Sequence, residues 1–140
     1  MRKKVSEADK KFLDERASGR CEYCKSLRKY SPQPFVTEHI IPIAENGSND
    51  LENLALACGG CNGHKYTKTT GIDPISNQEV PLFNPRKDIW EMHFQWSADN
   101  LKMIGITATG RATINTLCLN REFVINLRVL TSMTNEHPPT

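Results

Sequence analysis

Two Cys-x2-Cys pairs constrain the fold of this chain more than any other feature. Cys21 and Cys24 form the first pair, Cys58 and Cys61 form the second, and 33 residues separate the pairs. Each pair presents two thiolates from one turn, and together they supply the tetrahedral four-sulfur site that is typical of structural zinc. Because protein ligands fill all four positions, this zinc should stabilise the fold and bind no water. Cys118 lies outside both pairs, and we expect it to be a small core residue.

Length and composition suit a small domain that needs such a metal. The chain has 140 residues, which predicts a single domain over residues 1–130. Its hydrophobic content of 38% is low for a globular chain, so zinc would add stability to a modest core. The net charge is only +2, yet residues 1–30 hold ten Lys and Arg against five Asp and Glu. This basic end suits a polyanionic partner, and an ordinary solvated surface explains it equally well.

The sequence carries no membrane or export signal that we recognise. No apolar run approaches the roughly 20 residues that span a bilayer, and the basic start of the chain leads into charged residues. We therefore expect a cytoplasmic protein with no membrane partner. Thiols stay reduced in that compartment, which favours cysteine as a metal ligand over cysteine in disulfides.

The first half of the chain alternates helix and strand patterns. Apolar residues at helical spacing predict a helix over 7–18, with Ser6 as its N-cap. A β-branched run from Phe35 to Ile43 predicts a strand that bends into a long loop of turn residues. Residues 53–57 are expected to return as a second strand, and a short helix over 62–69 should follow.

The second half predicts a hairpin and two short helices. The expected elements are a short extended segment at 80–83, hairpin strands at 92–96 and 101–106, and helices at 110–118 and 121–130. Asn120 stands between the helices as a candidate cap. Residues 131–140 show no periodicity, so a disordered tail is expected there.

A motif lies between and directly after the cysteine pairs. It reads Glu38-His39-Ile40-x-Pro42, then Gly47, then Asp50-Leu51-x-Asn53-Leu54, and Asn62-x2-Lys65 follows the last cysteine. Together with the cysteines, this pattern resembles the HNH, or ββα-metal, endonucleases in their four-cysteine zinc form, and the remaining sequence is similar to stand-alone bacterial members. The resemblance implies an α+β fold whose ββα-metal core covers residues 21–70. The N-terminal helix, the C-terminal hairpin and the two C-terminal helices would surround this core.

The resemblance also implies a role for each motif residue. His39 would be the general base that takes a proton from water, and Asn53 would hold the loop that carries it. Glu38 would bind a divalent cation, Mg²⁺ or Mn²⁺, beside the scissile phosphate. Asn62 stands where the family motif ends in histidine, and its amide oxygen is expected to be the second ligand of that cation. The implied activity is hydrolysis of DNA phosphodiester bonds that leaves 5′-phosphates.

Several alternatives stay open at this level. His64 is a weaker candidate ligand than Asn62, and Lys65 and Lys68 either contact phosphates or form a solvated helix face. RNA as a substrate, the oligomeric state and the preferred DNA structure are also open. The alternative function is a non-catalytic, zinc-stabilised module that binds nucleic acid or protein. A purely structural zinc protein leaves the Glu38-His39 pair unexplained.

Overall fold

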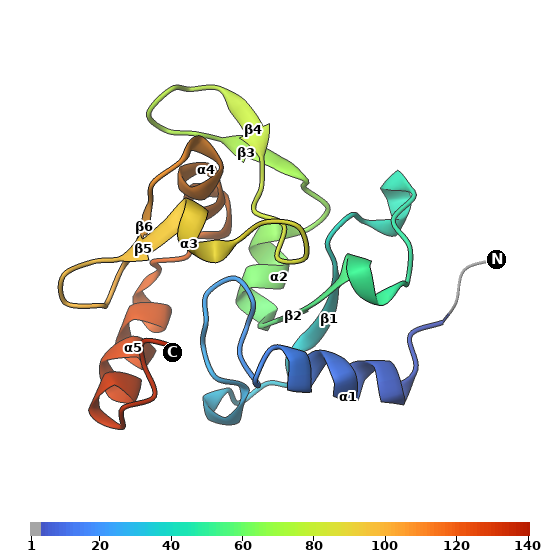
Figure 1. Cartoon of the computed structure of the whole chain (residues 1–140), viewed down its shortest axis with the longest axis horizontal. Coiled ribbons are helices and arrows are strands. Elements are labelled where there is room, and N and C mark those ends of the chain that lie inside the picture. Colours follow the sequence, from blue (N-terminus) through green and yellow to red (C-terminus); the bar gives the residue numbers. More distant parts are fainter. Residues whose placement is uncertain (1–3) are drawn as a thin grey trace. The chain divides into compact units, whose positions relative to one another are not determined.

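Three antiparallel two-stranded sheets, each joined to helices, make up the described part of this α+β chain (Figure 1). The structure is a computed structural model that describes residues 4–140. These residues divide into two compact units. The first unit contains the residues up to Thr69 together with Asn84–Lys87, and the second contains Thr70–Phe83 and Asp88–Thr140. The sequence-based domain boundaries at residues 1–130 stay a prediction.

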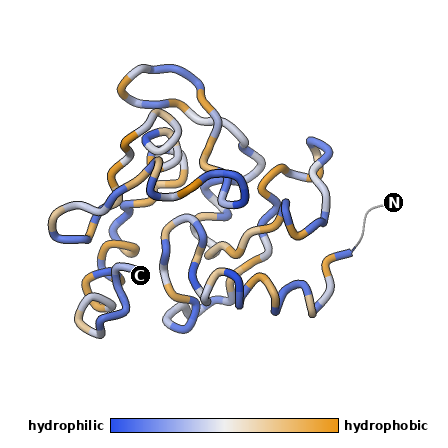
Figure 2. The backbone as a smooth tube through the Cα atoms, in the orientation of Figure 1, coloured by the Kyte–Doolittle hydropathy of each residue, from blue (hydrophilic) through white to orange (hydrophobic). Residues whose placement is uncertain are grey.

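Helix α1, Glu7–Arg16, begins at a capping box. The Ser6 hydroxyl accepts a hydrogen bond from the Asp9 amide at 3.0 Å, and the Asp9 carboxylate accepts one from the Ser6 amide at 3.1 Å. Most of the helix is hydrophilic (Figure 2), and Leu13 is the side chain that it buries completely. The predicted helix is confirmed but ends two residues early, because Ser18 and Gly19 adopt left-handed backbone conformations.

The centre of the first unit is a ββα arrangement. Strand β1, Val36–His39, pairs with β2, Leu54–Ala57, so that His39 lies opposite Leu54. The connection contains two short 3-10 turns, at Ile43–Glu45 and Leu51–Asn53. Every residue of β2 is buried, and the chain passes from it through Cys58 directly into helix α2, Gly59–Lys65.

Helix α2 begins earlier than the sequence pattern predicts. We expected a helix over 62–69, whereas the helix starts at Gly59 because the Cys58 sulfur caps it by accepting a hydrogen bond from the Cys61 amide. The second cysteine pair therefore belongs to the first turn of the helix. The helix ends at Lys65, since Tyr66 has a φ of 51°.

Residues 84–87 belong to the first unit although they are distant from it in sequence. Arg86 forms an ion pair with Glu22, whose other carboxylate oxygen accepts a hydrogen bond from the Leu56 amide at 2.8 Å. Burial lowers the pKa of Arg86 to about 10, so this guanidinium stays charged at neutral pH.

The second unit contains two hairpins and three helices. They are β3 (Thr70–Ile72) with β4 (Glu79–Pro81), β5 (Phe94–Trp96) with β6 (Met103–Gly105), α3 (Trp90–His93), α4 (Ala108–Leu117) and α5 (Glu122–Met133). The predicted hairpin at 92–106 and both C-terminal helices are confirmed. Phe94 is buried and packs edge-on against Phe83, with ring centroids 5.2 Å apart, and Trp90 lies 5.5 Å from Phe94. Phe83 and Phe94 are therefore core residues, and Trp90 is half-buried beside them.

Three details of the second unit differ from the sequence expectations. Asn120 does not cap α5; its amide instead bonds both backbone groups of Met103, at 2.8 and 2.9 Å, while Arg121 takes the cap position. Cys118 is exposed at the left-handed end of α4, so its assignment to the core is wrong. The expected tail at 131–140 includes the last turn of α5, and buried His137 stacks edge-on against Trp96.

None of the helices in residues 4–140 combines the length and the apolar character that a membrane crossing requires.

Candidate active site

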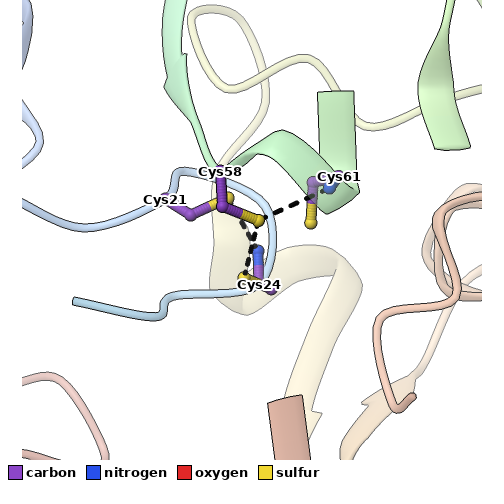
Figure 3. Close-up of side chains that lie close together, drawn as sticks. All are labelled: Cys21, Cys24, Cys58 and Cys61. Atoms are coloured by element: carbon purple, nitrogen blue, oxygen red, sulfur yellow. Dashed lines mark hydrogen bonds between the residues drawn. The ribbon is translucent and has the colours of Figure 1, made fainter. Parts of the chain in front are cut away.

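The four paired cysteines converge on one point of the first unit. Their sulfur atoms all lie within 4.8 Å of one another, and those of Cys24 and Cys58 are 3.8 Å apart (Figure 3). Cys21 and Cys24 come from the turn after α1, whereas Cys58 and Cys61 come from the start of α2. In each pair the second amide donates a hydrogen bond to the first sulfur, at 3.5 and 3.4 Å. This geometry suits one tetrahedral zinc ion.

The protonation of the cluster also suits a metal. Burial raises the pKa of the Cys21 thiol, whereas hydrogen bonds from Cys21 and Cys24 lower the pKa of Cys58 well below its usual range. The hydrogen bond from Cys21 lowers the pKa of Cys24 to about 7. Hydrogen bonds between the sulfur atoms therefore favour a thiolate at Cys58, and a bound zinc ion would displace the protons of the remaining thiols.

His39 lies at the end of β1, half-buried, with one ring nitrogen already occupied. Its Nε2 atom lies 2.6 Å from Oδ1 of Asn49. Because an amide oxygen can only accept, Nε2 carries the proton and Nδ1 is the basic nitrogen. Among the described residues Nδ1 has no hydrogen-bond partner, so it is free to accept a proton.

Asn53 fastens the loop that follows His39. Its side-chain oxygen accepts from the Ile41 amide at 2.9 Å, and its side-chain nitrogen donates to the carbonyls of Ile41 and Ser48, at 3.0 and 2.8 Å. The loop passes so close to itself that a Cβ atom on Gly47 would lie 1.7 Å from the Ile41 carbonyl oxygen. These bonds hold Ser48, and with it the neighbouring Asn49, near the imidazole.

Glu38 points to the opposite face of β1 from His39, as neighbouring strand residues do. Its carboxylate is buried; one oxygen accepts from the Tyr23 hydroxyl at 2.5 Å, and the other accepts from the Lys65 ammonium at 2.9 Å. Lys65 also donates to the Ile40 carbonyl at 2.9 Å. Burial, followed by the nearby charge of Glu38, raises the pKa of Tyr23, so the phenol stays a hydrogen-bond donor.

Comparison with known proteins identifies the motif that these residues form. Residues 21–68 match the family model described as HNH endonuclease. This segment is an HNH endonuclease domain. It contains the complete cysteine cluster, both strands of the ββα arrangement and helix α2. Searches of the curated proteins and of the solved structures return no match. An HNH domain indicates a nuclease-type function that acts on nucleic acid with the help of a divalent metal.

The HNH domain does not present Glu38 as the sequence pattern predicts. A cation that also touches a phosphate needs an accessible carboxylate, whereas the Glu38 side chain is 2% exposed and both of its oxygens have donors. A cation held jointly by Glu38 and Asn62 therefore does not fit this arrangement. Lys65 is equally buried, so neither alternative left open for it, a phosphate contact or a solvated helix face, describes its position, whereas Lys68 is exposed.

Asn62 lies in α2, which packs against β1. Its side chain is half-buried and has no hydrogen-bond partner among the residues that the structure describes, so its amide oxygen is available. His64 is exposed two residues later.

Sequence reasoning missed Asn49 as a partner of His39. The residue belongs to the run Asn46-Gly47-Ser48-Asn49-Asp50, which we interpreted only as turn chemistry. Side-chain amides in a loop directly after a candidate base are the signal that could have identified it.

Proposed function

We propose that this chain is an endonuclease that hydrolyses DNA phosphodiester bonds, with His39 as the general base. The observation that carries the proposal is the state of the His39 ring inside the HNH domain: Nε2 donates to Asn49, which leaves Nδ1 basic and without a partner in residues 4–140. Nδ1 would take a proton from water as the oxygen attacks phosphorus. The bond to the 3′ oxygen then breaks, and the 5′-phosphate stays on the other fragment.

Asn62 is our proposed oxygen ligand for the divalent ion of this family. A neutral amide oxygen suits Mg²⁺ or Mn²⁺, and its available side chain supports this role. Such an ion, when bound, neutralises charge on the phosphate and the leaving oxygen. Because the Glu38 carboxylate is paired with Lys65, we assign it no part in holding the ion.

Plasmid cleavage in Mg²⁺ or Mn²⁺ tests the proposed base. General-base catalysis typically contributes about 10² to 10⁴ in rate, so His39→Ala should lose about that much activity. His64→Ala compares the other imidazole of the domain, and a much smaller loss there than in His39→Ala assigns the base to His39. A His39→Ala rate within a few-fold of the wild type would reject the assignment.

A second candidate is a binding module that has kept the HNH shape without turnover. Two observations favour it: Glu38 is locked in an ion pair, and Asn62 replaces the last histidine of the motif. The same assay separates the two functions, since wild-type protein that binds DNA and never nicks it would be the module.

A further inference from the structure

Tyr66 combines an exposed ring with an unfavourable backbone. It directly follows helix α2 and lies four residues after Asn62, and 73% of the residue is exposed. Its φ of 51° and ψ of −124° lie in a region that residues with a Cβ atom rarely occupy.

The strain comes from a tight turn at the end of the helix. The Lys68 amide donates to the Lys65 carbonyl at 2.9 Å, which closes a four-residue turn with Tyr66 at its second position. These dihedral angles are those of a type II′ turn, in which that position strongly favours glycine. The backbone conformation at this position is therefore unfavourable for tyrosine.

Packing does not account for the tyrosine either. Within residues 4–140, no hydrogen bond or ring contact involves its side chain. Lys65, one residue earlier, is buried and forms an ion pair with Glu38, so the first residue of the turn is held in place by the domain. The protein thus holds an aromatic ring out into solvent at the end of the helix that carries Asn62.

We propose that Tyr66 stacks on an unpaired base of the DNA substrate, an inference that rests on the proposed nuclease function. Aromatic rings bind exposed bases by stacking, with little dependence on sequence. Bases inside a continuous duplex are already stacked on both faces, so the ring selects DNA with a bulged, flapped or single-stranded nucleotide. Lys68, exposed two residues later, supplies a cation that fits the neighbouring phosphate.

Binding measurements in a His39→Ala background, which slows cleavage, test this inference. Fluorescence anisotropy would compare a labelled duplex that carries a three-nucleotide bulge with the same duplex fully paired. We expect Tyr66→Ala to weaken binding of the bulged DNA about fivefold or more and to leave the paired duplex nearly unchanged. Tyr66→Phe should keep the parent affinity for both DNAs.

Tyr66→Gly separates binding from stability. Glycine accepts the turn without strain, so its melting temperature should rise while its affinity for bulged DNA falls as in Tyr66→Ala. Tyr30→Ala is the matched control: this residue of the same unit is 44% exposed, and we expect its removal to change neither affinity.

Four results would overturn the inference: unchanged binding of bulged DNA by Tyr66→Ala, equal losses on both DNAs, a lower melting temperature of Tyr66→Gly, or a parent that binds neither DNA. Failure of the proposed function is read separately, as an absence of plasmid cleavage when His39 is intact.

Discussion

At the scale of single residues, side-chain amides determine how His39 is presented. The Asn49 side chain accepts a hydrogen bond from His39 Nε2, and Asn53 ties the loop that carries Asn49 back to Ile41. A hydrogen-bond acceptor at one imidazole nitrogen determines that the other nitrogen is basic, and it fixes the direction in which that nitrogen points. The orientation of the base is therefore a property of the loop over residues 41–53.

Replacing Asn49 tests this arrangement. Asn49→Leu removes the acceptor and should lower the single-turnover cleavage rate about tenfold or more, whereas Asn49→Asp keeps an acceptor and should retain most of it. Thermal melting of both variants controls for folding. If the leucine variant cleaved within twofold of the wild type, Asn49 would have no positioning role.

The sequence pattern placed His39 and Asn53 in one motif, and it did not predict the surroundings of Glu38. A motif shows that two residues are near each other, but the alternation of a strand decides which face each side chain takes. Here that alternation turns Glu38 toward Tyr23 and Lys65. Lys65 reaches Glu38 because helix α2 packs against β1, and the motif does not show that packing.

At the scale of elements, the buried Glu38–Lys65 pair joins β1 to α2. Lys65→Met would leave a buried carboxylate without its cation and should destabilise the protein by about 3–5 kcal/mol. Adding Glu38→Gln to that variant removes the unpaired charge, so the double variant should be more stable than Lys65→Met. Urea unfolding of the wild type, Lys65→Met, Glu38→Gln and the double variant gives the four free energies of the cycle. Simple additivity of the two single effects would contradict the coupling.

The hairpin of the second unit has its own ion pair, which predicts a pH dependence. Asp73 accepts two hydrogen bonds from the Arg111 guanidinium, both at 2.9 Å, and these hold the pKa of Asp73 well below its usual range. The resulting stability is present above about pH 4, the ordinary pKa of an aspartate, and is lost as the pH falls through the lowered value. Asp73→Asn should therefore lower the melting temperature clearly at pH 7 and much less near pH 2. An equal effect at both values would exclude this origin.

The first residues of two helices show which boundaries a sequence pattern can predict. The helix predicted at 62–69 starts at Gly59, since a cysteine sulfur serves as the cap, which apolar periodicity does not register. The N-cap at Ser6 was predicted because it uses an ordinary hydroxyl, whereas the reciprocal bond from Asp9 was not predicted.

At the scale of the whole molecule, zinc should stabilise one compact unit directly. A chelator should increase amide exchange in β1, β2 and α2 of the first unit, while α4 and α5 of the second unit keep their protection. Cys58→Ser should lose bound zinc and melt at lower temperature, whereas Cys118→Ser, at the exposed fifth cysteine, should keep one zinc per chain. A wild-type melting temperature that is indifferent to zinc would contradict this role.

Two arginine side chains outside residues 21–68 stabilise the HNH domain. Arg16 of α1 donates to the carbonyls of Leu51 and Leu54, at 3.0 and 2.6 Å, and Arg86 neutralises the buried Glu22 from a separate stretch of chain. A fragment trimmed to the matched residues would lose both guanidinium groups and keep the acceptors that they satisfy. We therefore expect the smallest portion of this polypeptide able to fold autonomously to be larger than residues 21–68, because truncation at either end of that segment removes a stabilising arginine.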